Sequence, residues 1–280
     1  MFGRRASTRG VCVRALAAAR HDSGPQAPAA VSGILKAIPP GVDLLLPGSG
    51  VNLSRALVGY RPDLLICNGF PWRLPRSVLE IPRLGAINIH TSLLPRYRGP
   101  IPIHWAIRNG DPDVGVTIHR MDEAFDTGRV IVQRGGVPLP DEVVPEELFR
   151  QLDAVTCGLL PFALNRVRAG FPGEPQNEAD ASYAGWMEPG FSFIDWSRTA
   201  REIHNQVRAF RFGVPGPPGP VAQVGGRRVA VLRTRLDPPV DGEQAGVRMG
   251  CADGPLWVTE SVPHDHVDAC PAAWRQFRQR

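Results

Sequence analysis

The stretch that decides the fold covers residues 85–128 and reads GAINIHTSLLPRYRGPIPIHWAIRNGDPDVGVTIHRMDEAFDTG. It opens with a short apolar segment in which Asn88 and His90 alternate with isoleucines. Alternate residues of a β-strand share a face, so the isoleucines should pack inside while Asn88 and His90 face one site together. An amide beside an imidazole suits a reaction in which a carbonyl oxygen gains negative charge. The amide can donate a hydrogen bond to that oxygen, and the imidazole can stabilise it or move a proton.

A carboxylate follows in the same stretch. Asp126 lies in the turn FDTG, ahead of another apolar segment. A carboxylate at this place could take the proton that an attacking nucleophile loses, directly or through an ordered water. Taken singly, a strand-end His, a strand-end Asn and an Asp before Thr-Gly are more often structural than catalytic. The hypothesis of a catalytic site therefore depends on their combination.

The loop after the first strand contains an apolar pair. Residues 91–99 read TSLLPRYRG, with Leu93 and Leu94 adjacent. Such a pair in a loop either packs on a ligand or folds beneath the sheet.

Outward from this stretch, short apolar segments alternate with helical patterns. Strands are expected at residues 43–46, 63–67, 85–90, 114–121 and 129–137. Helices are expected at residues 52–60, with Asn52 or Ser54 as the cap, and at 145–170, where Pro161 should kink or split the helix. This alternation predicts an α/β fold with a mostly parallel, Rossmann-like sheet. Ligands of such sheets bind beyond the carboxyl ends of the strands, which is where His90 lies.

A polar, proline-containing segment at residues 172–182 indicates a domain boundary. It separates a domain of residues 1–180 from one of residues 190–280. The second domain is predicted to be a small, β-rich, OB-like barrel. Its expected elements are a helix at 199–210, a hairpin at 221–236 that turns at Gly225-Gly226, and strands within 246–258.

Composition limits the class of protein. Of 280 residues, 43% are apolar and 21% are charged, which is typical of a soluble globular protein. The net charge of +5 suits an anionic partner such as a polyglutamylated cofactor, a nucleotide or tRNA, without choosing among them. The five cysteines lie far apart without metal-ligand spacing, which favours reduced thiols, a cytoplasmic protein and no metal. No apolar run reaches the roughly 20 residues of a membrane span.

The first 20 residues contain five arginines and no acid. This pattern is found in transit peptides, but a strand stub at residues 1–3 followed by a surface helix at 10–20 also explains it. We expect the helix, followed by a loop at residues 21–30.

Together these motifs resemble the folate-dependent formyltransferase family. That family includes methionyl-tRNA formyltransferase, glycinamide ribonucleotide transformylase, amino-sugar formyltransferases and formyltetrahydrofolate hydrolase. The resemblance covers roughly residues 43–210. The matching residues include Asn88-Ile89-His90, Ser92-Leu93-Leu94-Pro95, Arg98-Gly99, Gly115-Val116-Thr117-Ile118-His119, Asp126-Thr127-Gly128 and Ile194-Asp195-Trp196.

The resemblance implies roles for these residues. Asn88 and His90 would hold the formyl oxygen, and Asp126 would help to remove a proton from the attacking amine and set the state of His90. The co-substrate would be 10-formyltetrahydrofolate, with no metal. The folate-side wall would be formed by Ser92, Leu93, Leu94 and Pro95. The pterin pocket would be bordered, largely through backbone groups, by residues 66–72, with Asn68 and Phe70, and by the turn of residues 121–126, with Asp122.

The remaining histidines receive lesser roles. His119 would support the site, and the expected surface or packing residues are His104, His204, His264 and His266.

The start of the chain departs from the family pattern of strand, turn, helix and strand. Only residues 1–3 could remain of the first strand, so the N-terminal strands are expected to be reduced. The loop at residues 21–30 is not basic and only about 60 residues follow Pro220, the size of a small module, so a small-molecule or peptide amine is the favoured acceptor. The alternatives are methionyl-tRNA formyltransferase, with initiator tRNA as the partner, a formyltetrahydrofolate hydrolase, and an inactive folate-binding remnant.

Overall fold

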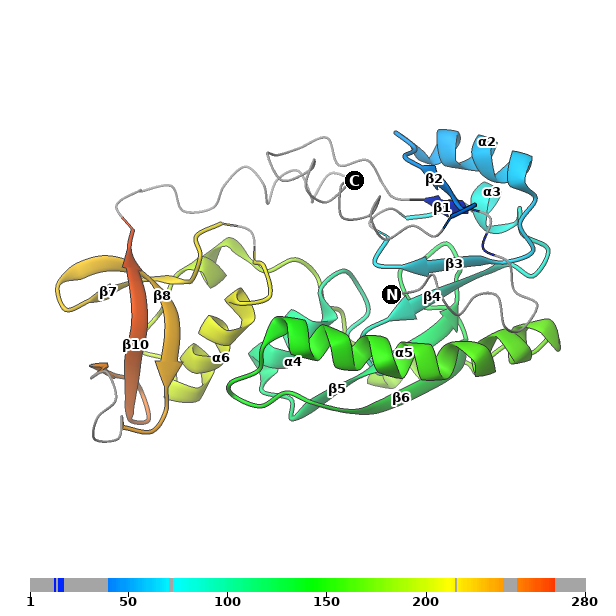
Figure 1. Ribbon diagram of the computed structural model, residues 1–280. Helices are drawn as coiled ribbons and strands as arrows, with labels where there is room; N and C mark the ends of the chain where they lie inside the picture. The colour runs from blue at the N-terminus through cyan, green and yellow to red at the C-terminus, as the bar shows by residue number, and fades with distance from the viewer. Residues whose placement is uncertain are drawn as a thin grey trace.

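The computed structural model describes residues 13, 15–17, 40–70, 73–214, 216–238 and 246–264. A four-stranded sheet with the order β3-β4-β5-β6 forms the centre of the first domain. Its strands are β3 (Leu65–Asn68), β4 (Ala86–His90), β5 (Asp113–Arg120) and β6 (Val130–Pro138). A separate parallel pair consists of β1 (Ala15–Ala17) and β2 (Asp43–Leu45) (Figure 1).

The α/β, Rossmann-like class is confirmed, but the central sheet is mixed. β3 and β4 are parallel, whereas β4 pairs with β5, and β5 with β6, in antiparallel orientation. The antiparallel β5–β6 pair follows from the short turn between the two strands, because a parallel pair needs a longer crossover. This arrangement replaces the expected mostly parallel sheet. The turn after β5 begins beside the start of β4, where the N–H of Met121 donates to the carbonyl oxygen of Ala86, and it folds back so that Asp126 reaches Asn88 and Gly99.

The long helix α5 (Pro145–Arg168) lies across one face of this sheet (Figure 1). Its apolar stripe joins the main core with residues of β5 and β6. The helix continues through Pro161, so the expected split does not occur. Leu152 and Leu159 before the proline, and Ala163 and Val167 after it, are buried, and this packing holds the helix together on both sides.

Two further helices were not predicted, although the end signals of α4 are present in the sequence. α4 (Pro102–Asn109) begins with a proline and ends at Gly110, which has φ of +74°. The short α3 (Arg76–Leu79) packs with α2 (Gly50–Tyr60) and β3 in a second, smaller core.

The predicted cap of α2 is wrong. The helix begins at Gly50, before Asn52 and Ser54, and its cap is Ser49. The hydroxyl of Ser49 accepts a hydrogen bond from the backbone N–H of Asn52.

The predicted helix at residues 10–20 is also wrong where the structure describes it. Residues 15–17 form strand β1, because pairing with β2 satisfies their backbone groups in a parallel ladder. The predicted strand at residues 1–3 and the predicted loop at residues 21–30 lie outside the described residues.

The second domain is built on an antiparallel sheet with the order β7-β8-β10-β9. Its elements are α6 (Ala200–Phe210), β7 (Val221–Val224), β8 (Arg227–Arg235), β9 (Val247–Gly250) and β10 (Pro255–Pro263). The expected hairpin turns at Gly225 and Gly226, whose φ angles are +57° and +77°. Two short 3-10 helices, η2 (Glu178–Asp180) and η3 (Pro189–Ser192), lie in the segment that joins the domains. Within the described ranges, no helix combines a bilayer-spanning length with enough apolar character to cross a membrane.

We expect the substitution Gly158→Ala to raise the free energy of unfolding by about 0.5–1 kcal/mol. Gly158 lies on the exposed side of α5, and a Cβ atom built there has no neighbour within 4 Å. Alanine therefore adds helix propensity without a steric cost. Urea denaturation measures the change, and a loss of stability would contradict the packing described for α5.

The matched control is Gly128→Ala, for which we expect the opposite sign. A Cβ atom at Gly128 would collide with the backbone carbonyl oxygen of Arg120. The turn after Asp126 would have to move, at a cost of about 1–3 kcal/mol.

Candidate active site

The register of β4 and β5 brings the first site residues together. Asn88 lies directly opposite His119, and His90 lies opposite Thr117. Ile87 and the next isoleucine of β4 are buried on the other face, as the alternation predicted. The side chains of Asn88, His90 and His119 therefore converge at one end of the strand pair.

The carboxylate of Asp126 lies at the centre of this group. Its Oδ1 atom accepts a hydrogen bond of 3.1 Å from Nδ2 of Asn88 and lies 3.4 Å from Nε2 of His119. Its Oδ2 atom accepts a hydrogen bond of 2.8 Å from the backbone N–H of Gly99 and lies 3.7 Å from Nδ1 of His90. The three predicted catalytic residues are thus neighbours in space.

The hydrogen bond of His90 to the backbone determines which ring nitrogen carries the proton. Nε2 lies 2.7 Å from the carbonyl oxygen of Tyr97, and a carbonyl only accepts, so Nε2–H must donate. Burial lowers the pKa of His90 and outweighs the nearby charge of Asp126, which acts in the opposite direction. In the neutral ring, Nδ1 is therefore an acceptor that faces the Oδ2 acceptor of Asp126. These two acceptors can bind a group that donates N–H hydrogens.

The environment keeps Asp126 ionised. Burial would raise the pKa of its carboxyl, but the contact with His119, the proximity of His90 and the N–H of Gly99 outweigh burial and lower the pKa to about 2. The site therefore contains a partly buried carboxylate beside a neutral imidazole.

The amide of Asn88 has a fixed orientation. Nδ1 of His119 lies 2.7 Å from the carbonyl oxygen of Arg120 and donates to it. Nδ2 of Asn88 donates to Oδ1 of Asp126 and also lies 3.3 Å from Nε2 of His119. Because the carboxylate of Asp126 only accepts, the NH2 group of Asn88 must face the site.

The loop after β4 is tied to the sheet beneath it. The hydroxyl of Thr117 donates to the carbonyl oxygen of Ser92 at 2.7 Å and accepts from the N–H of Leu94 at 3.1 Å. The side chain of Leu93 lies against Gly115 and Gly135, where an added Cβ atom would come within 2.7 and 2.9 Å of it. The apolar pair of this loop therefore folds onto β5 and β6.

The other residues of this predicted folate wall take part in similar contacts. The Ser92 hydroxyl donates to the carbonyl oxygen of Arg96 at 2.6 Å, Leu94 is buried, and the carbonyl oxygen of Pro95 accepts from the N–H of Ser182. Because these side chains are already bonded or buried, the loop would contact a bound molecule mainly through its shape and its backbone groups.

The two segments predicted to border a pterin pocket lie side by side. Asn68 ends β3, which runs parallel to β4, and Phe70 packs at the edge of the second core together with Met121. The guanidinium of Arg73 donates to the carbonyl oxygen of Glu123 and joins the two segments. Trp72 lies outside the described residues.

Asp122 stabilises the turn of residues 121–126, which borders the predicted pterin pocket opposite residues 66–70. Its Oδ1 atom accepts hydrogen bonds from the N–H of Ala124 at 3.0 Å and the hydroxyl of Thr127 at 2.7 Å. Both Asn68 and Asp122 are exposed, so their polar atoms can reach a bound molecule.

Gln176 was not predicted to belong to the site. Its side-chain amide donates to the carbonyl oxygens of Asp126 and Gly128, at 2.8 and 2.7 Å. Gln176 follows Asp126 by about fifty positions in a segment expected to be only a domain boundary, and no local pattern connects the two residues.

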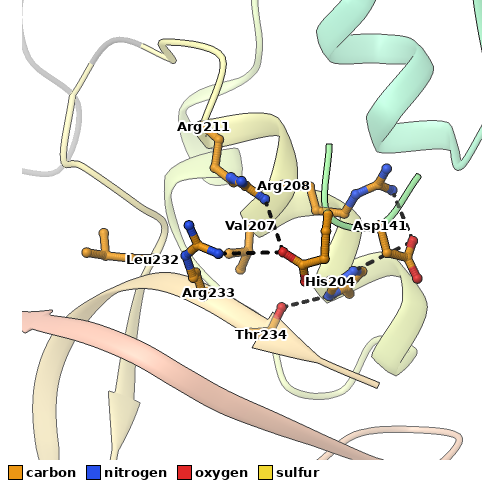
Figure 2. Close-up of a pocket in the computed structure, with 9 residues that line it drawn as sticks. Asp141, His204, Val207, Arg208, Arg211, Leu232, Arg233 and Thr234 are labelled. Carbon is orange, nitrogen blue, oxygen red and sulfur yellow. Dashed lines mark hydrogen bonds and ion pairs between the residues drawn. The ribbon is translucent and has the colours of Figure 1, made fainter. Parts of the chain in front are cut away.

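A small hollow lies elsewhere, between α6 and β8 (Figure 2). Charged side chains line it, and most of them pair with one another: Arg208 with Asp141 at 3.6 Å, and Arg211 and Arg233 with Glu142 at 3.8 and 3.6 Å. Arg208 also donates to the carbonyl oxygens of residues 139 and 140, which fastens α6 to the end of β6. These contacts describe a junction between the domains, so we assign the hollow no catalytic role.

The remaining histidines lie away from the candidate site. His204 is buried and bonds to the hydroxyl of Thr234 through Nδ1 at 2.9 Å, and His104 bonds to the carbonyl oxygen of Phe212 through Nε2 at 3.1 Å. His266 lies outside the described residues. In the part of the chain that the structure describes, no group of three or more His, Cys, Asp or Glu side chains is arranged to hold a metal ion.

Two family models match the chain. The model described as formyl transferase matches residues 51–154, and the model described as formyl transferase, C-terminal domain, matches residues 187–269.

Curated relatives are similar over most of the chain. The methionyl-tRNA formyltransferase of Pelobacter propionicus is 35% identical over 210 residues, which cover 71% of this chain and 63% of the relative. The methionyl-tRNA formyltransferase of Synechococcus sp. strain JA-3-3Ab is 33% identical over 242 residues, which cover 77% and 73%. The chain spans 62–64% of the length of the Pelobacter propionicus relative and of the methionyl-tRNA formyltransferases of Desulfotalea psychrophila and Trichlorobacter lovleyi.

Solved structures share the fold. HypX from Aquifex aeolicus in complex with tetrahydrofolic acid has a TM-score of 0.61 at 22% identity, covering 85% of this chain and 43% of that one. The sugar 3N-formyl transferase WlaRD, crystallised in the presence of dTDP and 5-N-formyl-THF, has a TM-score of 0.59 at 19% identity, covering 91% and 100%.

The lowered pKa of His90 predicts a pH dependence of stability. In the unfolded chain a histidine titrates near 6.5, and the folded protein binds this proton more weakly. The free energy of unfolding should therefore fall as the pH drops below about 6.5, by at most about 1.4 kcal/mol for each pH unit between the two pKa values.

The comparison is between the wild type and His90→Gln in urea denaturation, from about pH 7.5 to about pH 5. The wild type should lose more stability than the variant over this interval. Parallel pH profiles would contradict the assignment of a buried, neutral His90.

Proposed function

Because the chain belongs to the formyltransferase family, we propose that it moves a formyl group from 10-formyltetrahydrofolate to a primary amine. Asn88, His90 and Asp126 carry the reaction. The observation that supports this role most strongly is the pair of acceptors, Nδ1 of His90 and Oδ2 of Asp126, 3.7 Å apart. An attacking amine brings N–H hydrogens that this pair can receive.

The chemistry divides among these side chains. The amine nitrogen attacks the formyl carbon, the bond from that carbon to the folate nitrogen breaks, and the acceptor gives up one proton while the folate nitrogen gains one. His90 takes the amine proton at Nδ1 and passes it on, and the charge of Asp126 stabilises the imidazolium meanwhile. Asn88 keeps one N–H on Asp126 and donates the other to the formyl oxygen as it gains charge.

This role refines the one implied by the family resemblance. With Nε2–H bonded to Tyr97 and Nδ1 as an acceptor, neutral His90 has no hydrogen for the formyl oxygen. Holding that oxygen therefore falls to Asn88, and His90 acts on the proton.

The donor site fits a folate at the ends of β3 and β4. Asn68, Phe70 and Asp122 border the pterin, and the loop of Ser92, Leu93, Leu94 and Pro95 forms the adjacent wall. Support comes from the hydrogen bond of Arg73 to Glu123, which joins the two bordering segments into one frame. The co-substrate supplies the activated formyl group when bound.

For the acceptor, we propose the amino group of methionyl-tRNA. The relatives named for this activity are 33–35% identical and align with up to 73% of their length, whereas the sugar N-formyltransferase WlaRD is 19% identical. The small-molecule amine that the sequence alone favoured is the second candidate, and the TM-score of 0.59 to WlaRD supports it. The domain division stays as proposed, with residues 1–180 for catalysis and residues 190–280 as the appended domain.

We expect Asp126→Asn to lower kcat/KM for formyl transfer by at least about 100-fold. The neutral amide keeps the shape but cannot stabilise the protonated His90. The matched control is Asp153→Asn, on the exposed side of α5. Circular dichroism should show that both variants are folded, and turnover within threefold of wild type in Asp126→Asn would contradict the assignment.

A product assay decides the acceptor. The protein is incubated with 10-formyltetrahydrofolate and either methionyl-tRNA or a pool of amino-sugar nucleotides, and mass spectrometry reads the gain of one formyl group. We expect formylmethionine on the tRNA. Formylated amino sugar with unmodified tRNA would favour the second candidate, and formate release at an equal rate without amine would indicate a hydrolase.

A further inference from the structure

Asp126 has a backbone conformation that needs support. Its φ angle is +57°, in the left-handed region that residues with a Cβ atom adopt at a cost. This conformation turns the carboxylate back towards Gly99 and Asn88. These contacts hold the side chain of Asp126. The left-handed backbone conformation needs hydrogen bonds of its own from another part of the chain.

Gln176 provides that support. Its Nε2 atom donates to the carbonyl oxygen of Asp126 at 2.8 Å and to that of Gly128 at 2.7 Å. These two bonds use both hydrogens of the amide. They clamp the turn on each side of Thr127.

The direction of the Gln176 amide is itself fixed. Arg98 donates to its Oε1 atom through Nε at 3.0 Å and through a terminal nitrogen at 2.8 Å. A guanidinium only donates and a carbonyl only accepts, so the amide cannot flip. Arg98 is 8% exposed, and its carboxylate partner Glu178 binds it with two hydrogen bonds of 2.9 and 2.7 Å.

The backbone around Gln176 is anchored on both sides. Before it, Glu174 exchanges two hydrogen bonds of 2.8 Å with Val130, next to the turn. After it, Tyr183 forms a β-bridge with Arg98, and the backbone N–H of Arg98 donates to the carbonyl oxygen of Ser182 at 2.9 Å. Gln176 therefore acts from a rigid support rather than from a free linker.

We propose that Gln176, in the segment between the domains, is a positioning residue that holds Asp126 in the orientation used for catalysis. The inference rests on the proposed function of Asp126. It makes the interdomain segment part of the active site, so that a change in the position of this segment reaches the proton-transfer pair through one amide.

The test uses Gln176→Met, which keeps the length of the side chain and removes its hydrogen bonds. We expect kcat for formyl transfer to fall about tenfold or more while KM for 10-formyltetrahydrofolate changes less than about threefold, because misplacement of a reacting group acts on the chemical step. Gln176→Glu is the second variant: it keeps an acceptor for Arg98 but loses both donors, and kcat should fall similarly. The matched control is Asn177→Ala, in the same segment without contact to Asp126, with kcat close to that of wild type.

A second readout is independent of activity. The N–H of Gly99 donates to Oδ2 of Asp126, so hydrogen exchange of this amide in the ligand-free protein reports the carboxylate position. We expect exchange at Gly99 to become at least about fivefold faster in both Gln176 variants and to stay unchanged in Asn177→Ala.

The outcomes separate the two proposals. Unchanged exchange at Gly99 together with unchanged kcat overturns the positioning role of Gln176. An equal loss of kcat in Asn177→Ala also overturns it, because a general weakening of the segment would then explain the effect. If the wild type transfers no formyl group to any acceptor, the proposed function fails, and faster exchange at Gly99 still supports the role of Gln176 in holding Asp126.

Discussion

The rest of the site depends on one partly buried carboxylate, that of Asp126. A charge removed from water is costly unless hydrogen bonds and opposite charges compensate for it. Here the compensation comes from Asn88 and His119 on neighbouring strands and from the N–H of Gly99 in the loop after β4. The requirement explains why the turn after β5 must fold back over the end of β4.

That constraint accounts for features that are otherwise separate. The antiparallel β4–β5 pair puts His119 opposite Asn88, and the absence of a side chain at Gly128 lets the turn pass close to the backbone of Arg120. The carbonyl oxygen of Tyr97 holds the ring of His90 so that Nδ1 faces the carboxylate. Nδ1 of the neutral imidazole and the ionised carboxylate are then both acceptors, and no proton is shared between them before an amine binds.

Several elements of this arrangement could be predicted from the sequence, because their signals are local. The alternation in β4 correctly placed Asn88 and His90 on one face, and the paired glycines correctly placed the hairpin of the second domain. Other elements depend on distant contacts and left no local signal. The strand at residues 15–17 exists because β2 pairs with it, α5 continues through Pro161 because both sides are packed, and Gln176 meets Asp126 only in the folded chain.

In the proposed reaction, Asn88, His90 and Asp126 surround a formyl group presented by a folate. The most direct measurement is a crystal structure of the protein with 5-formyltetrahydrofolate, a stable analogue of the co-substrate. We expect the pteridine to lie between residues 66–70 and 121–126, with the formyl-bearing side of the ligand turned towards Asn88 and His90. Ligand density at another place, or the absence of binding in calorimetry with the same compound, would contradict it.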